Sequence, residues 1–247
     1  MTNLPDSKNG HSAGTAVFDQ IRSSVEGVIR GKSDAVRLAL CCLVARGHLL
    51  IEDNPGTGKT TLAKAVAGVF GGSVRRVQFT PDLLPSDITG VTVFDPRTTT
   101  FTFRKGPVFA NILVADEINR ASPKTQAALL EVMEERQVTS DGTSRPVPDP
   151  FMVVATQNPL DFQGTYPLPE VQLDRFAMKL SLGYAGREAE LELLARSRRS
   201  DGDLEVRQVL DVATFGELSS AAEAVTVTQP LYGYVVVARD DSAERMA

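Results

Sequence analysis

The sequence lacks any apolar run that approaches the roughly 20 residues of a membrane-spanning helix. Its first 16 residues are polar and lack the apolar segment of a secretory signal peptide. We therefore expect a cytoplasmic chain without membrane insertion, in which residues 1–16 form a flexible tail.

Cysteine is also scarce. The 2 cysteines among 247 residues, Cys41 and Cys42, are adjacent within an apolar helical pattern. They have no distant partner for a disulfide bond and no third or fourth cysteine to complete a zinc site. Two buried, reduced thiols are the simplest interpretation, and they agree with a cytoplasmic location.

The sequence also has no excess of basic over acidic residues. The chain has 31 acidic and 26 basic side chains, and its formal net charge is −5. The most basic cluster, Arg196, Arg198 and Arg199, fits the exposed face of a helix. These features disfavour a nucleic-acid surface. The absence of an Asn-Lys-x-Asp motif likewise disfavours a GTP-binding switch protein.

The chain does have an ordinary hydrophobic content of 42%, enough for the core of one or two domains. Residues 48–72 organise the rest. An apolar run at 48–52 is typical of a buried strand, and residues 53–58 form a turn rich in Gly and Pro. Apolar residues at helical spacing follow from Lys59 until Gly71. Strand, loop and helix in this order are the context of a phosphate-binding loop.

The loop carries residue types that suit a bound triphosphate. Gly56 and Gly58 let successive backbone N–H groups converge on an anion, and the following helix adds its own free N–H groups. Lys59 is expected to reach the β- and γ-phosphates, Thr60 to offer a hydroxyl to Mg²⁺, and Thr61 to lie near the α-phosphate. The expected nucleotide-binding residues of this segment are Asn54, Pro55, Gly56, Thr57, Gly58, Lys59, Thr60 and Thr61.

One position departs from the strict pattern G-x-x-x-x-G-K-[ST]. The first glycine of that pattern falls at residue 53, where this chain has Asp53. A plain Gly/Pro turn with a solvated Lys59 is therefore the alternative interpretation. The complete strand–loop–helix context favours phosphate binding over that alternative.

Two further apolar strands are predicted, and each is followed by polar residues. The strand at 111–115 precedes Asp116 and Glu117, and the strand at 151–155 leads to Asn158. Because ligands bind at the carboxyl ends of the strands in parallel α/β sheets, we expect these side chains to face the phosphates.

The expected roles of these three side chains differ. Asp116 would hold Mg²⁺ together with Thr60, Glu117 would polarise the attacking water, and Asn158 would orient that water. The plainer alternative for Asp116 and Glu117 is an exposed acidic pair at a strand end. The plainer alternative for Asn158 is an Asn-Pro turn.

Two residues outside these segments are further candidates. Ile29 ends an amphipathic helix before Gly31 and is an expected adenine contact, with plain packing as the alternative. Arg175 lies near the end of a predicted short helix that opens at Pro169. It is expected to act as an arginine finger on a neighbouring subunit, with a local ion pair as the alternative. The remaining predicted elements are helices over 17–30, 33–46 (capped by Ser33) and 123–135 (capped by Ser122), a strand over 74–79, and β-hairpins over 90–104 and 137–148.

Four spaced segments together resemble the MoxR family of AAA+ ATPases over roughly residues 17–195. They are Asp53-Asn-Pro-Gly-Thr-Gly-Lys-Thr-Thr, Asp116-Glu-Ile-Asn-Arg-Ala, Ala155-Thr-Gln-Asn-Pro and Leu173-Asp-Arg-Phe. The resemblance implies an α/β P-loop NTPase fold of the AAA+ type, with a parallel sheet flanked by helices, β-hairpin inserts and a partial C-terminal helical lid. The implied domains are a nucleotide-binding α/β domain over 17–183 and the lid over 184–247.

The resemblance also implies chemistry and partners. It assigns the phosphate loop pair to Lys59 and Thr60, the metal and catalytic carboxylates to Asp116 and Glu117, the sensor to Asn158 and the arginine finger to Arg175. It further implies ATP with Mg²⁺, self-association into a ring that is typically a hexamer, protein clients, and a partner with a von Willebrand A domain. The two hairpins look like the helix-2 insert and the insert before the sensor strand.

The C-terminal part departs from the family pattern. Helices are predicted over 186–199, 211–223 and 228–239. The small-residue–Pro–Arg stretch that carries the lid's sensor arginine in the family is not found, and Arg239 and Arg245 lack its neighbours. We therefore expect an incomplete lid and weakened turnover.

The leading hypothesis is an ATP-hydrolysing enzyme that remodels or matures client proteins. A nucleotide-binding regulatory subunit with little turnover is one alternative, and ATP affinity measured beside turnover separates the two. A nucleic-acid-linked NTPase motor is another, because restriction-type GTPases carry a similar Asp116-Glu-Ile-Asn-Arg segment. GTP preference or stimulation by DNA would support that third hypothesis.

Overall fold

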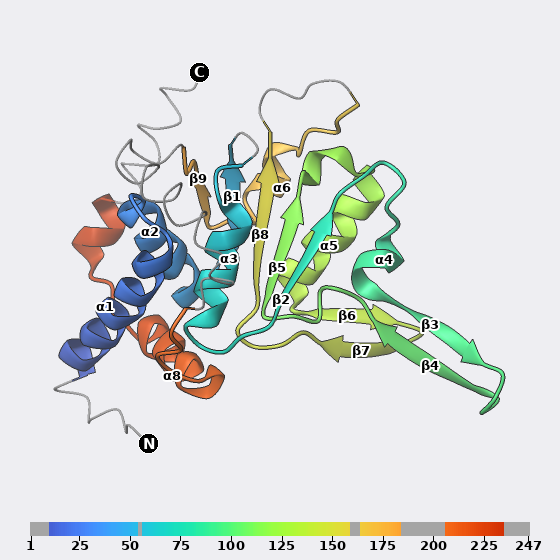
Figure 1. Cartoon of the computed structure of the whole chain (residues 1–247), viewed down its shortest axis with the longest axis horizontal. Coiled ribbons are helices and arrows are strands. Elements are labelled where there is room, and N and C mark those ends of the chain that lie inside the picture. Colours follow the sequence, from blue (N-terminus) through green and yellow to red (C-terminus); the bar gives the residue numbers. More distant parts are fainter. Residues whose placement is uncertain (1–9, 54–55, 159–163, 184–205, 235–247) are drawn as a thin grey trace, which may run out of the picture.

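A five-stranded parallel sheet forms the centre of the molecule (Figure 1). The computed structural model describes residues 10–53, 56–158, 164–183 and 206–234. The strand order is β2-β5-β8-β1-β9, and every neighbouring pair is parallel. The strands are β1 (Leu49–Glu52), β2 (Val74–Gln78), β5 (Ile112–Asp116), β8 (Met152–Gln157) and β9 (Met178–Leu180).

Helices cover both faces of this sheet, so the molecule has three layers (Figure 1). Alternate residues of a strand point to opposite faces. Leu49 and Ile51 of β1 pack in one core and Leu50 in the other. The first core lies under α1 (Gly10–Val28), α2 (Ser33–Val44), α3 (Lys59–Gly68) and α8 (Val212–Glu223). The second lies under α4 (Pro85–Thr89), the 3-10 helix η1 (Ile118–Arg120) and α5 (Pro123–Glu135).

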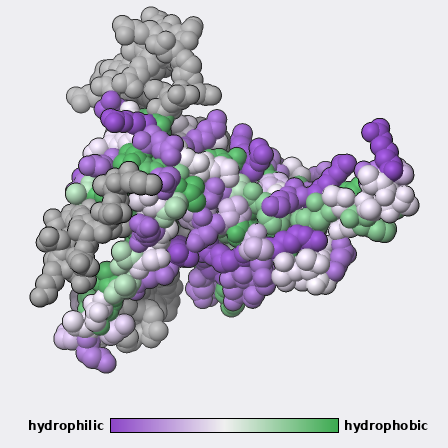
Figure 2. Space-filling view, turned by 90° about the horizontal axis from the view of Figure 1, so that it is seen from below, coloured by the Kyte–Doolittle hydropathy of each residue, from purple (hydrophilic) through white to green (hydrophobic). Residues whose placement is uncertain are grey.

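Two β-hairpins extend from the second layer, as the sequence predicted. They are β3 (Gly90–Asp95) with β4 (Thr100–Lys105), and β6 (Gln137–Ser140) with β7 (Thr143–Pro146). The first projects far from the body as a narrow arm (Figure 2). The Thr92 hydroxyl donates to the Asp141 carboxylate and so ties the two hairpins together. Asp141 and Gly142 have φ of 53° and 70°, the left-handed values that a tight hairpin turn requires.

The predicted α/β P-loop fold is confirmed, and several details differ. The first helix begins at Gly10 and therefore overlaps the predicted tail. The sequence did not indicate this start, because residues 10–16 carry no apolar periodicity. Ser33 is not the cap of α2, since the N-cap is Lys32 and the Ser33 hydroxyl donates to Glu26. Three elements, α4, α6 (Glu170–Leu173) and β9, are too short to show a hydrophobic periodicity in the sequence. Of these three, only the short helix α6 was predicted.

The predicted lid is described in part. The helix expected over 211–223 is confirmed as α8, which the Asp211 carboxylate caps. Residues 229–234 are helical, within the third predicted range, and the helix expected over 186–199 lies outside the described residues. No helix in the described ranges is long and apolar enough to cross a bilayer.

His48 joins the start of β1 to its neighbours. The ring is 4% exposed. Its Nδ1 accepts from the Val153 N–H at 2.9 Å and its Nε2 donates to the Met133 carbonyl at 3.1 Å. Burial, reinforced by the nearby charge of Arg136, lowers the pKa of His48 to about 4. The neutral ring is therefore the form that fits this site, because a second proton would break the bond from Val153.

We expect His48 to make folding sensitive to mild acid. The unfolded chain binds a proton at His48 near pH 6.5, whereas the native chain binds it near pH 4. The stabilisation is therefore complete above pH 6.5 and is lost as the pH falls from 6.5 to 4, by up to about 3 kcal/mol. Urea unfolding of the wild type and of His48→Gln at several pH values measures the difference in unfolding free energy. That difference should narrow towards pH 4, because the wild type loses this stabilisation in acid and the variant has no imidazole to titrate. A difference that stays constant with pH would contradict the lowered pKa of His48.

Candidate nucleotide-binding site

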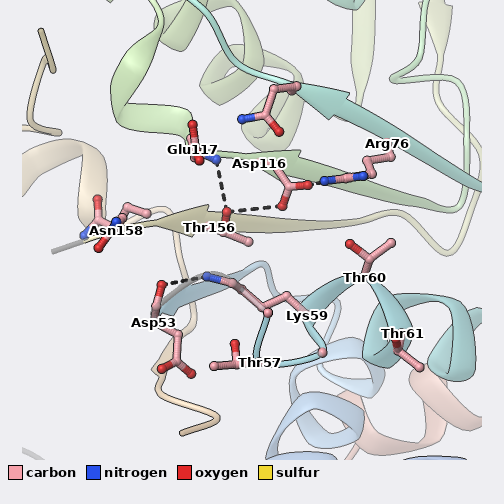
Figure 3. Close-up of a pocket in the computed structure, with 14 residues that line it drawn as sticks. Asp53, Thr57, Lys59, Thr60, Thr61, Arg76, Asp116, Glu117, Thr156 and Asn158 are labelled. Atoms are coloured by element: carbon pink, nitrogen blue, oxygen red, sulfur yellow. Dashed lines mark hydrogen bonds and ion pairs between the residues drawn. The ribbon is translucent and has the colours of Figure 1, made fainter. Parts of the chain in front are cut away.

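A cavity of about 390 Å³ opens at the carboxyl edge of the sheet (Figure 3). Residues 56–61 form one wall, and the ends of β1, β2, β5 and β8 form the other. The predicted site residues that line this cavity are Gly56, Thr57, Gly58, Lys59, Thr60, Thr61, Asp116, Glu117 and Asn158. Asn54 and Pro55 lie outside the described residues. Ile29 and Arg175 lie elsewhere.

The loop has the backbone conformation expected of an anion-binding turn. Gly56 and Gly58 have φ of 84° and 91°, which residues with a side chain rarely adopt. Among the described residues other than the glycine and its neighbours in the chain, no heavy atom lies within 4 Å of the position that a Cβ would take at either glycine, so conformation rather than crowding requires them. Gly58 is the N-cap of α3, a helix of 10 residues whose first N–H groups lie beside the cavity. These groups can bind the oxygens of a phosphate.

Lys59 lies between the loop and the acidic strand ends. Its Nζ donates to the Asp53 carbonyl at 2.7 Å (Figure 3). Burial lowers the pKa of Lys59, and the charges of Asp53, Asp116 and Glu117 oppose that shift. The ammonium group is thus partly desolvated, and a partly desolvated cation interacts more strongly with an added polyanion than a fully hydrated one does.

Asp53, which replaces the first glycine of the strict pattern, has a defined structural role. Its carboxylate is buried and accepts from the N–H groups of Leu182 and Gly183 at 2.6 and 2.8 Å. Lys32 makes a second connection, donating to the carbonyls of Thr57 and Gly183 at 2.8 and 2.7 Å. Both ends of the phosphate loop are therefore bonded to the segment that follows β9. The sequence gives no signal for this clamp, because its partners are up to 151 residues apart.

A threonine on β8 bonds both acidic residues at the end of β5, one through its carboxylate and one through its backbone N–H. The Thr156 hydroxyl donates to Asp116 Oδ1 at 3.2 Å and accepts from the Glu117 N–H at 3.0 Å (Figure 3). Glu117 has φ 56° and ψ 51°, a left-handed conformation that turns the chain out of the strand. Its carboxylate pairs with Arg120 at 2.9 Å. Sequence reasoning assigned no role to Thr156, which lines this corner of the cavity, or to Arg120, which pairs with Glu117.

The oxygen ligands at this edge suit Mg²⁺ shared with a phosphate. Asp116 and Thr60 line the same cavity. Mg²⁺ is usually bound through one or two carboxylates, with substrate phosphates and water completing its ligands. Among the described residues there is no group of three or more His, Cys, Asp or Glu side chains that could hold a metal alone. Asp116 and Thr60 thus fit a Mg²⁺ ion that a bound phosphate shares.

The remaining candidates occupy three different places. Asn158 directly follows β8 and lines the cavity on the side of Glu117 (Figure 3). Arg175 forms an ion pair with Glu134 of α5, outside its own cavity. Ile29 is buried and lines a second cavity of about 560 Å³, beside Lys32 and Leu182. Because Lys32 also contacts the loop carbonyl of Thr57, this second cavity borders the phosphate loop.

Comparison with known proteins supports a nucleotide-binding site of the AAA+ type. The family described as "ATPase family associated with various cellular activities (AAA)" matches residues 48–178. The uncharacterised protein YeaC of Bacillus subtilis is 47% identical over 212 residues, which are 86% of this chain and 66% of that protein. Chaperone MoxR1 of Mycobacterium tuberculosis is 40% identical over 232 residues, 94% of this chain and 61% of that protein. The chain thus spans less than two thirds of the length of these curated relatives.

A solved structure agrees with the fold. A protein from Cytophaga hutchinsonii, described as a candidate ATPase, superposes with a TM-score of 0.79 at 36% sequence identity. The match covers 92% of this chain and 71% of that protein.

The Asp53 clamp generates a prediction. In Asp53→Ala, the N–H groups of Leu182 and Gly183 lose their acceptor, a loss that typically costs about 1–3 kcal/mol. Amide hydrogen exchange at residues 182–183 should accelerate about tenfold or more, while exchange in β8 stays slow. Asp211→Ala, which removes a carboxylate acceptor at the start of α8, is the matched control and should leave 182–183 unchanged. Equal exchange at 182–183 in wild type and Asp53→Ala would contradict the clamp.

Proposed function

The chain belongs to the MoxR family of AAA+ ATPases, and on this premise we propose that it binds ATP in the loop cavity and hydrolyses it to ADP and phosphate. One observation carries the proposal. A glycine loop at a helix N-terminus, a lysine, and two adjacent carboxylates from another strand all line a single cavity. These are the groups that phosphoryl transfer requires, because its catalysis rests on positioning and charge stabilisation.

Each residue has a role that follows from its place. The loop N–H groups and Lys59 bind the phosphate oxygens, while Thr60 and Asp116 would hold Mg²⁺. The metal, when bound, neutralises charge on the β- and γ-phosphates. Glu117 accepts the proton of a water whose oxygen attacks the γ-phosphorus, as the bond from that phosphorus to the bridging oxygen breaks. Asn158 orients this water from the end of β8.

The adenine is proposed to bind in the second cavity, against Ile29. That cavity borders the phosphate loop through Lys32, and Ile29 offers it an apolar surface. A base placed there would lie between the turn that joins α1 to α2 and the segment that follows β9. Lys32 bonds that turn to the loop, and Asp53 bonds the segment after β9 to the loop.

Arg175 is proposed to act on a neighbouring subunit. It lies outside its own cavity, and its side chain is 34% exposed in the pair with Glu134, which is 59% exposed. Exposed ion pairs contribute only about 0–1 kcal/mol, so the guanidinium can leave Glu134 for a stronger anion at little cost. This role requires self-association, for which we propose a ring of six subunits, as the family resemblance implies.

The wider role is proposed from the relatives. One of them is named a chaperone, and we propose that this chain acts in the cytoplasm on protein clients, beside a partner with a von Willebrand A domain. The acidic balance of the chain disfavours a nucleic-acid partner.

Mixing two inactive variants tests hydrolysis and the subunit arrangement together. Glu117→Gln should bind ATP without hydrolysing it. Arg175→Ala should keep its own cavity intact but supply no arginine finger to the cavity of the neighbouring subunit. Neither should release phosphate alone. A 1:1 mixture should recover up to about a quarter of wild-type turnover, because an active interface needs Glu117 from one subunit and Arg175 from the next.

The control for this experiment is Glu134→Gln. It breaks the local ion pair of Arg175 but keeps the guanidinium, so its turnover should stay near that of the wild type. Undiminished turnover in Glu117→Gln would remove that residue from catalysis. A mixture as inactive as its components would exclude action between subunits.

A further inference from the structure

Arg76 of β2 contacts the carboxylate that we assign to the metal. Its Nε lies 2.5 Å from Asp116 Oδ2 (Figure 3). We propose that Arg76 is an exchangeable counterion of Asp116, which competes with the divalent cation for this oxygen and so weakens metal binding until a nucleotide is bound. The inference rests on the proposed function, because it concerns the same carboxylate.

The strand register places Arg76 where it can reach this oxygen. In the β2–β5 pairing, Arg76 lies opposite Val114 and Gln78 lies opposite Asp116. Residues two apart on a strand share a face, so Arg76 and Asp116 lie on the same face of the sheet. The arginine side chain spans the two-residue offset along the strand and enters the rim of the cavity. Arg75, the preceding residue, points to the opposite face and is not among the residues that line the cavity.

The burial of the two partners is unequal. The Asp116 side chain is 11% exposed, whereas the Arg76 side chain is 59% exposed. Asp116 is held in place, because its other oxygen accepts from the Thr156 hydroxyl and its strand lies inside the sheet, between β2 and β8. Arg76 can swing into water, and pairs with so exposed a partner are typically weak. The guanidinium is therefore the partner that leaves when a stronger cation arrives.

Charge decides which cation prevails. A single positive charge beside Asp116 reduces the attraction of a free divalent ion, both by occupying Oδ2 and by direct repulsion. The phosphates of a nucleotide would add negative charge on the loop side of the cavity and reverse this balance. Arg76 would thus favour uptake of metal and nucleotide together over uptake of metal alone.

Titration of Mn²⁺ in the absence of nucleotide tests this competition. Free Mn²⁺ is measured by electron paramagnetic resonance with the full chain. Arg76→Gln should bind Mn²⁺ about three- to tenfold more tightly than the wild type, because one competing charge is gone. Arg76→Lys keeps a positive charge at the rim and should stay closer to the wild type. Because Arg76 is exposed and lies on an edge strand, these variants should keep the fold.

The matched control is Arg75→Gln, which removes the same charge from the same strand but from the other face. It should bind Mn²⁺ as the wild type does. Adding Asp116→Asn to Arg76→Gln should abolish the gain. The inference is overturned if Arg76→Gln binds Mn²⁺ no more tightly than the wild type, or if Arg75→Gln tightens binding equally.

A second titration separates this inference from the proposed function. With a non-hydrolysable ATP analogue present, the wild type should bind Mn²⁺ tightly and Asp116→Asn should not. If this result is found, but Arg76→Gln and the wild type bind Mn²⁺ with equal affinity in the absence of nucleotide, then only the counterion role of Arg76 is wrong. If the wild type binds no Mn²⁺ with the analogue, the proposed metal site is wrong and the inference fails with it.

Discussion

The parallel pairing of β1, β5 and β8 is the constraint on which the site depends. Parallel strands end at the same edge of a sheet, so the phosphate loop after β1, the acidic pair after β5 and the amide after β8 meet there. Thr156 makes the arrangement specific, because its hydroxyl bonds Asp116 and the Glu117 N–H from the neighbouring strand. The packed apolar faces of these strands hold all three ends in place.

The acidic edge is balanced by cations and N–H groups from several elements. Arg76 pairs with Asp116, Arg120 with Glu117, and Lys179 with Glu52 at 2.6 Å. The Asp53 carboxylate instead accepts two backbone N–H groups. Each buried or half-buried carboxylate is thus compensated before any ligand is considered, as burial of charge requires. A polyanion and its metal would enter by rearranging these contacts, and the exposed partners such as Arg76 can move most easily.

The sequence predicts the parts of this site that are encoded locally. The strand–loop–helix at residues 48–72 and the strands before Asp116 and Asn158 follow from apolar periodicity and glycine placement, and the structure confirms them. The clamp made by Asp53 and Lys32 and the Arg76 pair could not be predicted, because they join residues from 25 to 151 positions apart. Ser33 was assigned as a helix cap from its residue type, but tertiary contact with Glu26 uses its hydroxyl. The roles proposed for Asn158, Arg175 and Ile29 stay predictions, since geometry shows where these residues lie and not what they bind.

A crystal structure of the full chain with a non-hydrolysable ATP analogue and Mn²⁺ tests the central claim most directly. The account predicts the triphosphate in the loop cavity, with Lys59 Nζ moved from the Asp53 carbonyl to phosphate oxygens. It also predicts an anomalous Mn²⁺ peak beside the Thr60 hydroxyl and the Asp116 carboxylate. A nucleotide bound elsewhere, or a Mn²⁺ peak remote from Asp116, would contradict it.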